Sequence, residues 1–293
     1  MKTAMQMRDF LFSTMCIIIG LIVISPVIYC VSASFMSSGD LSSYPPKFIP
    51  SQLFLKNYEI VFTSTPLLRF IWNSFLIAII GTVGRLITSS LAAYAFSFLE
   101  FKGKNIWFLV ILGTMMIPGD MLFITNYITV ANMKLINTYS GVIIVMMASA
   151  TYMFILRQHF LSISKEYRDA AFIDGCGDFR FFTSMLVPMS KSILSSIFIA
   201  SFIGLWNAYL WPLIVTNSEN MRTVQVGITM LQSSESIIYG PIMAGVTVIL
   251  IPSVLVFIIF QKQLVQGITL GGLKDSLIKY WRQLHEQDKI DCT

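Results

Sequence analysis

Charged side chains are scarce in this chain of 293 residues. They make up 12% of it, whereas an ordinary soluble domain carries about 25%. Hydrophobic residues make up 55% of the chain and fall in unbroken runs about 20 residues long, the length that crosses about 30 Å of hydrocarbon. The net charge is +5, but the basic residues lie between the apolar runs and form no patch, which excludes a nucleic-acid partner. This composition predicts an all-α membrane protein.

Sequence motifs that would indicate catalysis are also missing. The sequence has no Gly-x4-Gly-Lys-Ser/Thr phosphate loop, so we expect no ATPase site in it. Its two histidines, His159 and His285, belong to no metal-ligating or nucleophilic constellation, and its four cysteines do not suggest a disulfide framework. We therefore expect no catalytic residue, no metal site and no cofactor bound by this chain, and we predict that it is not an enzyme by itself.

Six apolar runs predict six membrane-spanning helices, because a spanning segment must satisfy its own backbone hydrogen bonds. The first run, from Phe10 to Tyr29, follows Lys2 and Arg8 and is longer than the 7–15 apolar residues of a signal peptide, so we interpret it as an uncleaved span. The expected spans are residues 10–33, 68–97, 105–128, 139–158, 192–216 and 241–262.

The distribution of Lys and Arg predicts the orientation. With a cytoplasmic N-terminus, fourteen of these residues fall inside and four outside. Both termini are then cytoplasmic. The predicted organisation is a first span and extracytoplasmic loop (1–66), a permease core (67–266) that contains a cytoplasmic loop (159–190), and a cytoplasmic tail (267–293).

The polar loop between the fourth and fifth expected spans has the pattern of two short amphipathic helices around a glycine turn. Gly175 and Gly177 permit backbone angles that other residues resist. Pro188 is expected to break the helical pattern before the next span. The expected apolar face is Phe179, Phe181, Phe182, Met185 and Leu186. The residues alone leave two interpretations open: a rigid knob for a cytoplasmic partner, or a helix resting on lipid headgroups.

A resemblance decides between them. The loop resembles the coupling signature of bacterial ABC-importer permeases, E-A-A, three residues, G, nine residues, I-x-L-P. Here the first three positions are Asp169, Ala170 and Ala171, and Gly175 and Pro188 follow at the same spacing. Asp for Glu, Met185 for Ile and Val187 for Leu are departures from the pattern. Residues 134–139, 206–212 and 267–274 resemble the carbohydrate-uptake branch, including the maltose-type second permease and the glycerol-3-phosphate-type permease.

The resemblance implies a bacterial cell membrane location, a coupling helix between the fourth and fifth spans, and several partners. These are a second permease subunit, two ATPase subunits that bind ATP and Mg²⁺, and an extracytoplasmic substrate-binding protein, with membrane lipid around the spans. Tail contacts with the ATPase are implied for Gly271, Gly272 and Lys274. The implied coupling residues are Asp169, Ala170, Ala171, Asp174, Gly175, Gly177 and Pro188.

The implied function is ATP-driven import of a sugar or oligosaccharide. An alternative is sn-glycerol-3-phosphate or a related phosphodiester. An alternative of another class is an ATPase-independent secondary transporter or membrane sensor, against which the coupling signature argues.

Two groups are candidates for the substrate pathway. Arg85 lies within the second expected span, where it either meets an anionic substrate group or forms a structural pair with Asp120. Trp206, Asn207 and Tyr209 lie in the fifth expected span, where they suit sugar binding but also suit a membrane interface.

Overall fold

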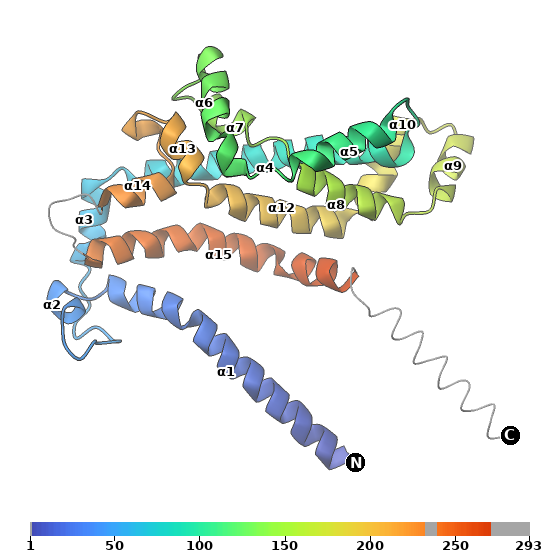
Figure 1. Ribbon diagram of the computed structural model, residues 1–293. Coiled ribbons are helices and arrows are strands. Elements are labelled where there is room, and N and C mark those ends of the chain that lie inside the picture. The colour runs from blue at the N-terminus through green and yellow to red at the C-terminus, as the bar shows by residue number, and fades with distance from the viewer. Residues whose placement is uncertain (1, 232–238, 271–293) are drawn as a thin grey trace. The chain divides into compact units, whose positions relative to one another are not determined.

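Helices are the regular secondary structure throughout the part of the chain that this computed structural model describes, residues 2–231 and 239–270 (Figure 1). The prediction of an all-α chain is confirmed over these residues. The chain divides into two compact units, residues 1–73 with 218–252 and residues 74–217 with 253–293. Two helices of 32 residues each, α4 (Leu67–Phe98) and α15 (Tyr239–Leu270), continue from one unit into the other.

The first unit is held together by polar side chains that bond to backbone. Asn57 is 3% exposed, and its Nδ2 donates to the carbonyls of Ser34 and Met36, each at 2.9 Å. Tyr58 and Ser34 join their hydroxyls at 2.7 Å. Besides the ends of α4 and α15, this unit contains α1 (Lys2–Ser34), α2 (Ser38–Leu41), α3 (Lys56–Ser64), the 3-10 turn η3 (Glu219–Met221) and α14 (Val224–Leu231).

An ion pair organises the loop that follows α2. Asp40 is 7% exposed and accepts hydrogen bonds from Lys47 Nζ at 2.6 Å and Ser51 Oγ at 2.8 Å. These bonds, with the one from Lys47 as the largest cause, lower the pKa of Asp40 to about 2. The carboxylate therefore stays ionised and fixes the loop over any physiological pH.

The second unit packs α4 against α8 and α12. Arg157 Nε on α8 donates to the Phe96 carbonyl on α4 at 3.2 Å, and Thr82 Oγ1 meets Ser201 Oγ on α12 at 3.3 Å. The other elements of this unit are α5 (Lys104–Thr114), the 3-10 turn η1 (Gly119–Leu122), α6 (Phe123–Asn132), α7 (Tyr139–Ile144), α8 (Ala150–Leu161), α9 (Glu166–Ile173), α10 (Asp178–Phe181), the π-helical turn η2 (Phe182–Leu186), α11 (Val187–Met189), α12 (Lys191–Trp206) and α13 (Leu210–Val215).

Three described helical stretches are long and apolar enough to cross a membrane without a break: Phe12–Ser34, Leu67–Phe98 and Tyr239–Ile259. Two bent pairs raise the count to five if each pair is one span. They are Lys104–Thr114 with Gly119–Asn132, bent by 92°, and Asp178–Met189 with Lys191–Trp206, bent by 80°.

The third, fourth and fifth expected spans are thus not continuous helices. The third bends before Pro118, which has no N–H to donate and disfavours helical backbone in the residue before it. The fourth is interrupted between α7 and α8 at residues 145–149, and the fifth between α12 and α13 at residues 207–209. The sixth expected span ends at residue 262, whereas α15 continues to Leu270.

Candidate functional site

The first helix of the polar loop, α9, ends in a glycine turn. Gly175 has φ of +77°, and its N–H donates to the Phe172 carbonyl at 3.0 Å, while the Cys176 N–H donates to the Ala171 carbonyl at 2.9 Å. This pair of bonds after a C-cap at Asp174 is a Schellman motif, in which a glycine in the left-handed conformation closes a helix. The prediction of a glycine turn is confirmed at Gly175. Gly177 instead has φ of −79°, which any residue adopts.

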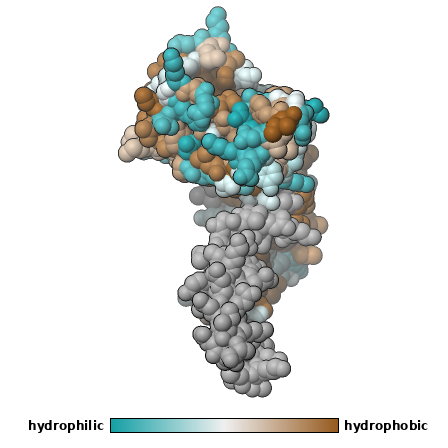
Figure 2. Space-filling view, turned by 90° about the vertical axis from the view of Figure 1, so that its right-hand side faces the viewer, coloured by the Kyte–Doolittle hydropathy of each residue, from teal (hydrophilic) through white to brown (hydrophobic). Residues whose placement is uncertain are grey.

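The predicted coupling residues fall into three groups. Asp169, Ala170 and Asp174 are exposed, as are both glycines. Ala171 is 4% exposed and packs within the chain, so its small size serves internal packing here and not approach by a partner. Pro188 is exposed but lies on α11 rather than α9. Figure 2 views the end of the second unit that carries α9 and α10, where hydrophilic residues gather around a few hydrophobic ones.

The helix breaks just before α12, two residues after Pro188. Pro188 itself lies in α11, and the chain bends by 80° after Met189, at Ser190. Because proline cannot donate a backbone hydrogen bond, the helix ahead of it shifts its bonding pattern, and a π-helical turn occupies Phe182–Leu186.

Four of the five residues of the predicted apolar face pack into the second unit. Phe181, Phe182 and Leu186 are at most 8% exposed, and Met185 packs beside them. They join Tyr94 and Phe98 of α4 and Leu156 and Phe160 of α8 in one hydrophobic cluster. Phe179 is 74% exposed, so it does not share the face that the other four residues form. The π-helical turn between Phe179 and Val187 changes the angular spacing on which the prediction relied.

A polar cluster lies beside this aromatic one. Asp178 Oδ1 accepts a hydrogen bond from the Tyr94 hydroxyl and another, at 3.0 Å, from Arg168 Nη2. The bond from Tyr94 and then that from Arg168 lower the pKa of Asp178. The loop pattern did not reveal this cluster, because Tyr94 lies 84 residues away in sequence within an apolar helix.

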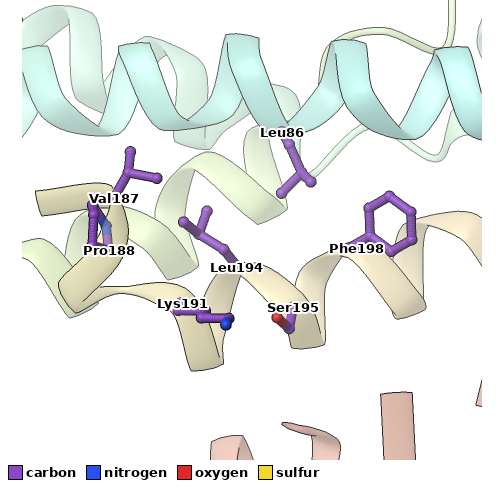
Figure 3. Close-up of a pocket in the computed structure, with 7 residues that line it drawn as sticks. All are labelled: Leu86, Val187, Pro188, Lys191, Leu194, Ser195 and Phe198. Carbon is purple, nitrogen blue, oxygen red and sulfur yellow. The ribbon is translucent and has the colours of Figure 1, made fainter. Parts of the chain in front are cut away.

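An apolar groove runs between α4 and the α11–α12 bend. One part, about 500 Å³, is lined by Leu86 of α4 together with Val187, Pro188, Lys191, Leu194, Ser195 and Phe198. Leu86 points from α4 toward α12, while Val187 and Leu194 point back toward α4 (Figure 3). A second part, about 420 Å³, shares Leu86, Val187 and Leu194 and extends to Phe179. Pro188 therefore borders a groove between α4 and α12.

The Arg85 side chain is hydrogen-bonded to the break between α7 and α8. Its Nε donates to the Met146 carbonyl, and Thr88 Oγ1 donates to the Met147 carbonyl at 2.7 Å. The expected structural pair with Asp120 is wrong, since Asp120 is exposed on η1 and makes no ion pair with Arg85 in the described structure. Residues 145–149 are not helical, so their carbonyls are available to donors outside the helix. One of these carbonyls is the partner of Arg85 in place of the Asp120 carboxylate.

The aromatic candidates lie at the interruption of the fifth span. Trp206 is 1% exposed and stacks on Phe202 with ring centroids 6.0 Å apart. Asn207 is exposed at the end of α12, and Tyr209 is half-buried before α13. Substrate contact by these residues stays a prediction. Gly271, Gly272 and Lys274, predicted to contact the ATPase, lie outside the described residues.

Comparisons with known proteins find a matching family model and similar relatives. A family model for the binding-protein-dependent transport system inner membrane component matches residues 49–270. The "sn-glycerol-3-phosphate transport system permease protein UgpE" of Brucella melitensis is 34% identical over 262 residues, which cover 86% of this chain and 93% of the relative. The "Arabinooligosaccharides transport system permease protein AraQ" of Halalkalibacterium halodurans is 34% identical over 260 residues, 87% of this chain and 93% of the relative.

A solved structure shares the fold. It is a chain of "a bacterial ABC transporter involved in the import of the acidic polysaccharide alginate", with a TM-score of 0.78 and 22% identity. The alignment covers 88% of this chain and 96% of that one. At this identity the likeness shows the helical architecture alone.

Proposed function

We propose that this chain, which belongs to the family of inner membrane components of binding-protein-dependent transport systems, is one of two permease subunits that an ATPase drives from the cytoplasm. Its relatives are named as permease proteins of transport systems, which makes it a transport subunit. ATP and Mg²⁺ then bind to two separate ATPase subunits, and an extracytoplasmic binding protein delivers the substrate. The second permease is a similar but non-identical chain.

The observation that carries this proposal is the shape of α9. Asp169, Ala170 and Asp174 are exposed on a short helix that a left-handed glycine closes tightly. A Schellman turn fixes the direction of the chain after the helix, so the knob has a defined outline. Such a knob suits a groove in a partner better than a flat lipid surface. We assign Asp169 to Gly177 to docking on the ATPase.

For the topology we propose six spans with both termini in the cytoplasm. The three unbroken helices, the bent pair Lys104–Thr114 with Gly119–Asn132, and α12 with α13 supply candidates for five of these spans, and the interrupted α7–α8 segment supplies the fourth. The excess of Lys and Arg on one side supports the orientation. The division into residues 1–66, 67–266 and 267–293, with the coupling loop at 159–190, belongs to the same proposal.

The substrate we propose is a sugar or oligosaccharide, the class for which the relative AraQ is named. A second candidate is sn-glycerol-3-phosphate, for which UgpE is named. Arg85 favours the second candidate. It is a cation within a membrane helix, bonded to a neutral carbonyl and without an acidic partner in the described structure, and such residues commonly serve an ion or substrate pathway.

Gly175→Arg tests the coupling function. The variant replaces a left-handed glycine at the exposed tip with a bulky side chain. We expect it to insert in the membrane as the wild type does, yet to lose co-purification with the ATPase and ATP-driven uptake. Normal transport by this variant would refute docking through α9. An ATPase that never co-purifies with the wild-type chain would favour the secondary transporter or sensor instead.

Arg85→Gln separates the two substrates. If a phosphate group meets Arg85, uptake of sn-glycerol-3-phosphate should fall by about tenfold or more, since a hydrogen bond to a charged group contributes about 1.5–3 kcal/mol. Arg85→Lys is the matched control and should retain most of the uptake. Unchanged uptake in both variants would leave Arg85 as a clamp on the Met146 carbonyl and favour a neutral sugar.

A further inference from the structure

One carboxylate oxygen joins three elements of the second unit. Asp178 Oδ1, at the start of α10, accepts from Tyr94 on α4 and from Arg168 Nη2 on α9. Figure 1 shows α9 and α10 together at one end of this unit, with α4 running from that end through its length. This acceptor thus links the exposed coupling knob to a 32-residue membrane helix, and the Arg168 side chain also interacts directly with the Tyr94 hydroxyl.

The knob has few other attachments to the rest of the unit. Ala171 is the only buried residue of α9. The Arg168 guanidinium lies over the Phe172 ring of the same helix, 4.7 Å from its centroid, and its buried Nε has no hydrogen-bond partner in the described structure. The contact through Nη2 is therefore the polar connection by which α9 reaches α10, and it leaves Asp169 and Ala170 exposed.

The other end of the link is rigid. Tyr94 is 6% exposed, and its ring packs on those of Phe98, Phe181 and Phe182 with centroids 5.4 to 6.5 Å apart. Aromatic pairs at these separations restrict the ring, so its hydroxyl is held toward Asp178. A displacement of α10 must then either move α4 or break this hydrogen bond.

We propose that Asp178 is a positioning residue that transmits movement of the ATPase-docked α9 to the membrane helix α4, by holding Arg168 and Tyr94 on one carboxylate oxygen. This inference rests on the proposed docking of α9. It assigns the transmission to residues that the coupling signature does not specify: Tyr94 and Arg168 precede the signature, and Asp178 lies at one of its unspecified positions.

The test uses the whole transporter in liposomes: this chain, its second permease, both ATPase subunits and the binding protein. The four native cysteines are replaced, and a reporter cysteine is placed at Ile87, which is 54% exposed on α4. The measurement is the change in maleimide labelling caused by ATP with vanadate, set against the rate of ATP hydrolysis. Tyr94→Phe removes only the hydroxyl and keeps the ring contacts, while Asp178→Asn removes the charge.

We expect both variants to retain the ATPase and hydrolyse ATP, while the nucleotide-driven labelling change falls by about fivefold or more, the lower end of usual coupling free energies. The double variant should be no worse than Asp178→Asn alone, because both remove one link. Tyr58→Phe is the matched control, since it also removes one tyrosine hydrogen bond, to Ser34, but in the first unit.

The outcomes separate the two proposals. A full labelling change in Tyr94→Phe, or an equal loss in Tyr58→Phe, would overturn the role of Asp178 while leaving the docking of α9 intact. Loss of the ATPase from the wild-type complex would instead overturn the docking on which this inference depends.

Discussion

At position 175 the effect of backbone strain on docking can be measured separately from the effect of a steric clash. Gly175 has φ of +77°, yet a Cβ built on it meets no atom within 4 Å. Gly175→Ala therefore adds no clash inside the chain and perturbs the backbone alone. A left-handed conformation costs a residue with a Cβ roughly 1–2 kcal/mol. If α9 must keep this turn to dock, the affinity for the ATPase falls by about 5–30-fold, the factor that corresponds to this energy.

Gly177→Ala is the matched control. It lies two residues away in the same loop and also has open space, but its φ of −79° suits any residue. We expect a smaller loss of affinity than for Gly175→Ala, because Gly177→Ala adds a methyl group to the docking segment without straining the backbone. Gly175→Asn should recover part of the loss because Asn tolerates the left-handed region. The assay is titration of the detergent-purified permease pair with labelled ATPase subunit. Equal losses in the two alanine variants, or none in Gly175→Ala, would refute the backbone argument.

Two further predictions concern stability. Gly141→Ala should destabilise the complex by about 1–3 kcal/mol, because its Cβ would clash with the Leu135 carbonyl oxygen. Thermal unfolding measured beside Gly113→Ala, where a Cβ meets no atom within 4 Å, checks this. The Asp40 pKa of about 2 lies below the ordinary 3.8, so its stabilisation is complete above about pH 4 and lost as pH falls through 2. Asp40→Asn should therefore make the loop at residues 42–55 sensitive to protease at neutral pH. The wild-type loop should resist cleavage until strongly acidic pH, and its cleavage at neutral pH would contradict this prediction.

Hydropathy predicted which segments form apolar helices but not where those helices break. An apolar run measures only transfer from water to hydrocarbon, and residues 139–158 are apolar on both sides of the break at 145–149. The break depends on partners elsewhere in sequence. Arg85 and Thr88 donate to the carbonyls that it frees, and these residues are about 60 positions earlier. Only tertiary structure brings those donors to the unwound backbone.

The glycine turn after α9 could be predicted from the sequence, but the contacts that attach α9 to the rest of its unit could not. Glycine is among the few residues that favour a left-handed backbone, so Gly175 in a polar loop carried a local signal. Tyr94 carried none, since a tyrosine within an apolar span usually indicates a membrane interface. The register beyond Gly177 also failed at Phe179, because a π-helical turn cannot be read from a spacing rule for α-helices.

The two faces of α9 explain why a short signature contains residues of different kinds. Asp169 and Ala170 are exposed, while Ala171, next in sequence, is buried, as helical geometry permits in a helix with one face packed inside and the other exposed. Substitutions at Ala171 should then weaken folding of the loop, and those at Ala170 should weaken docking alone. The sequence signature alone does not distinguish residues needed for internal packing from residues proposed for docking. Their burial in the structure does.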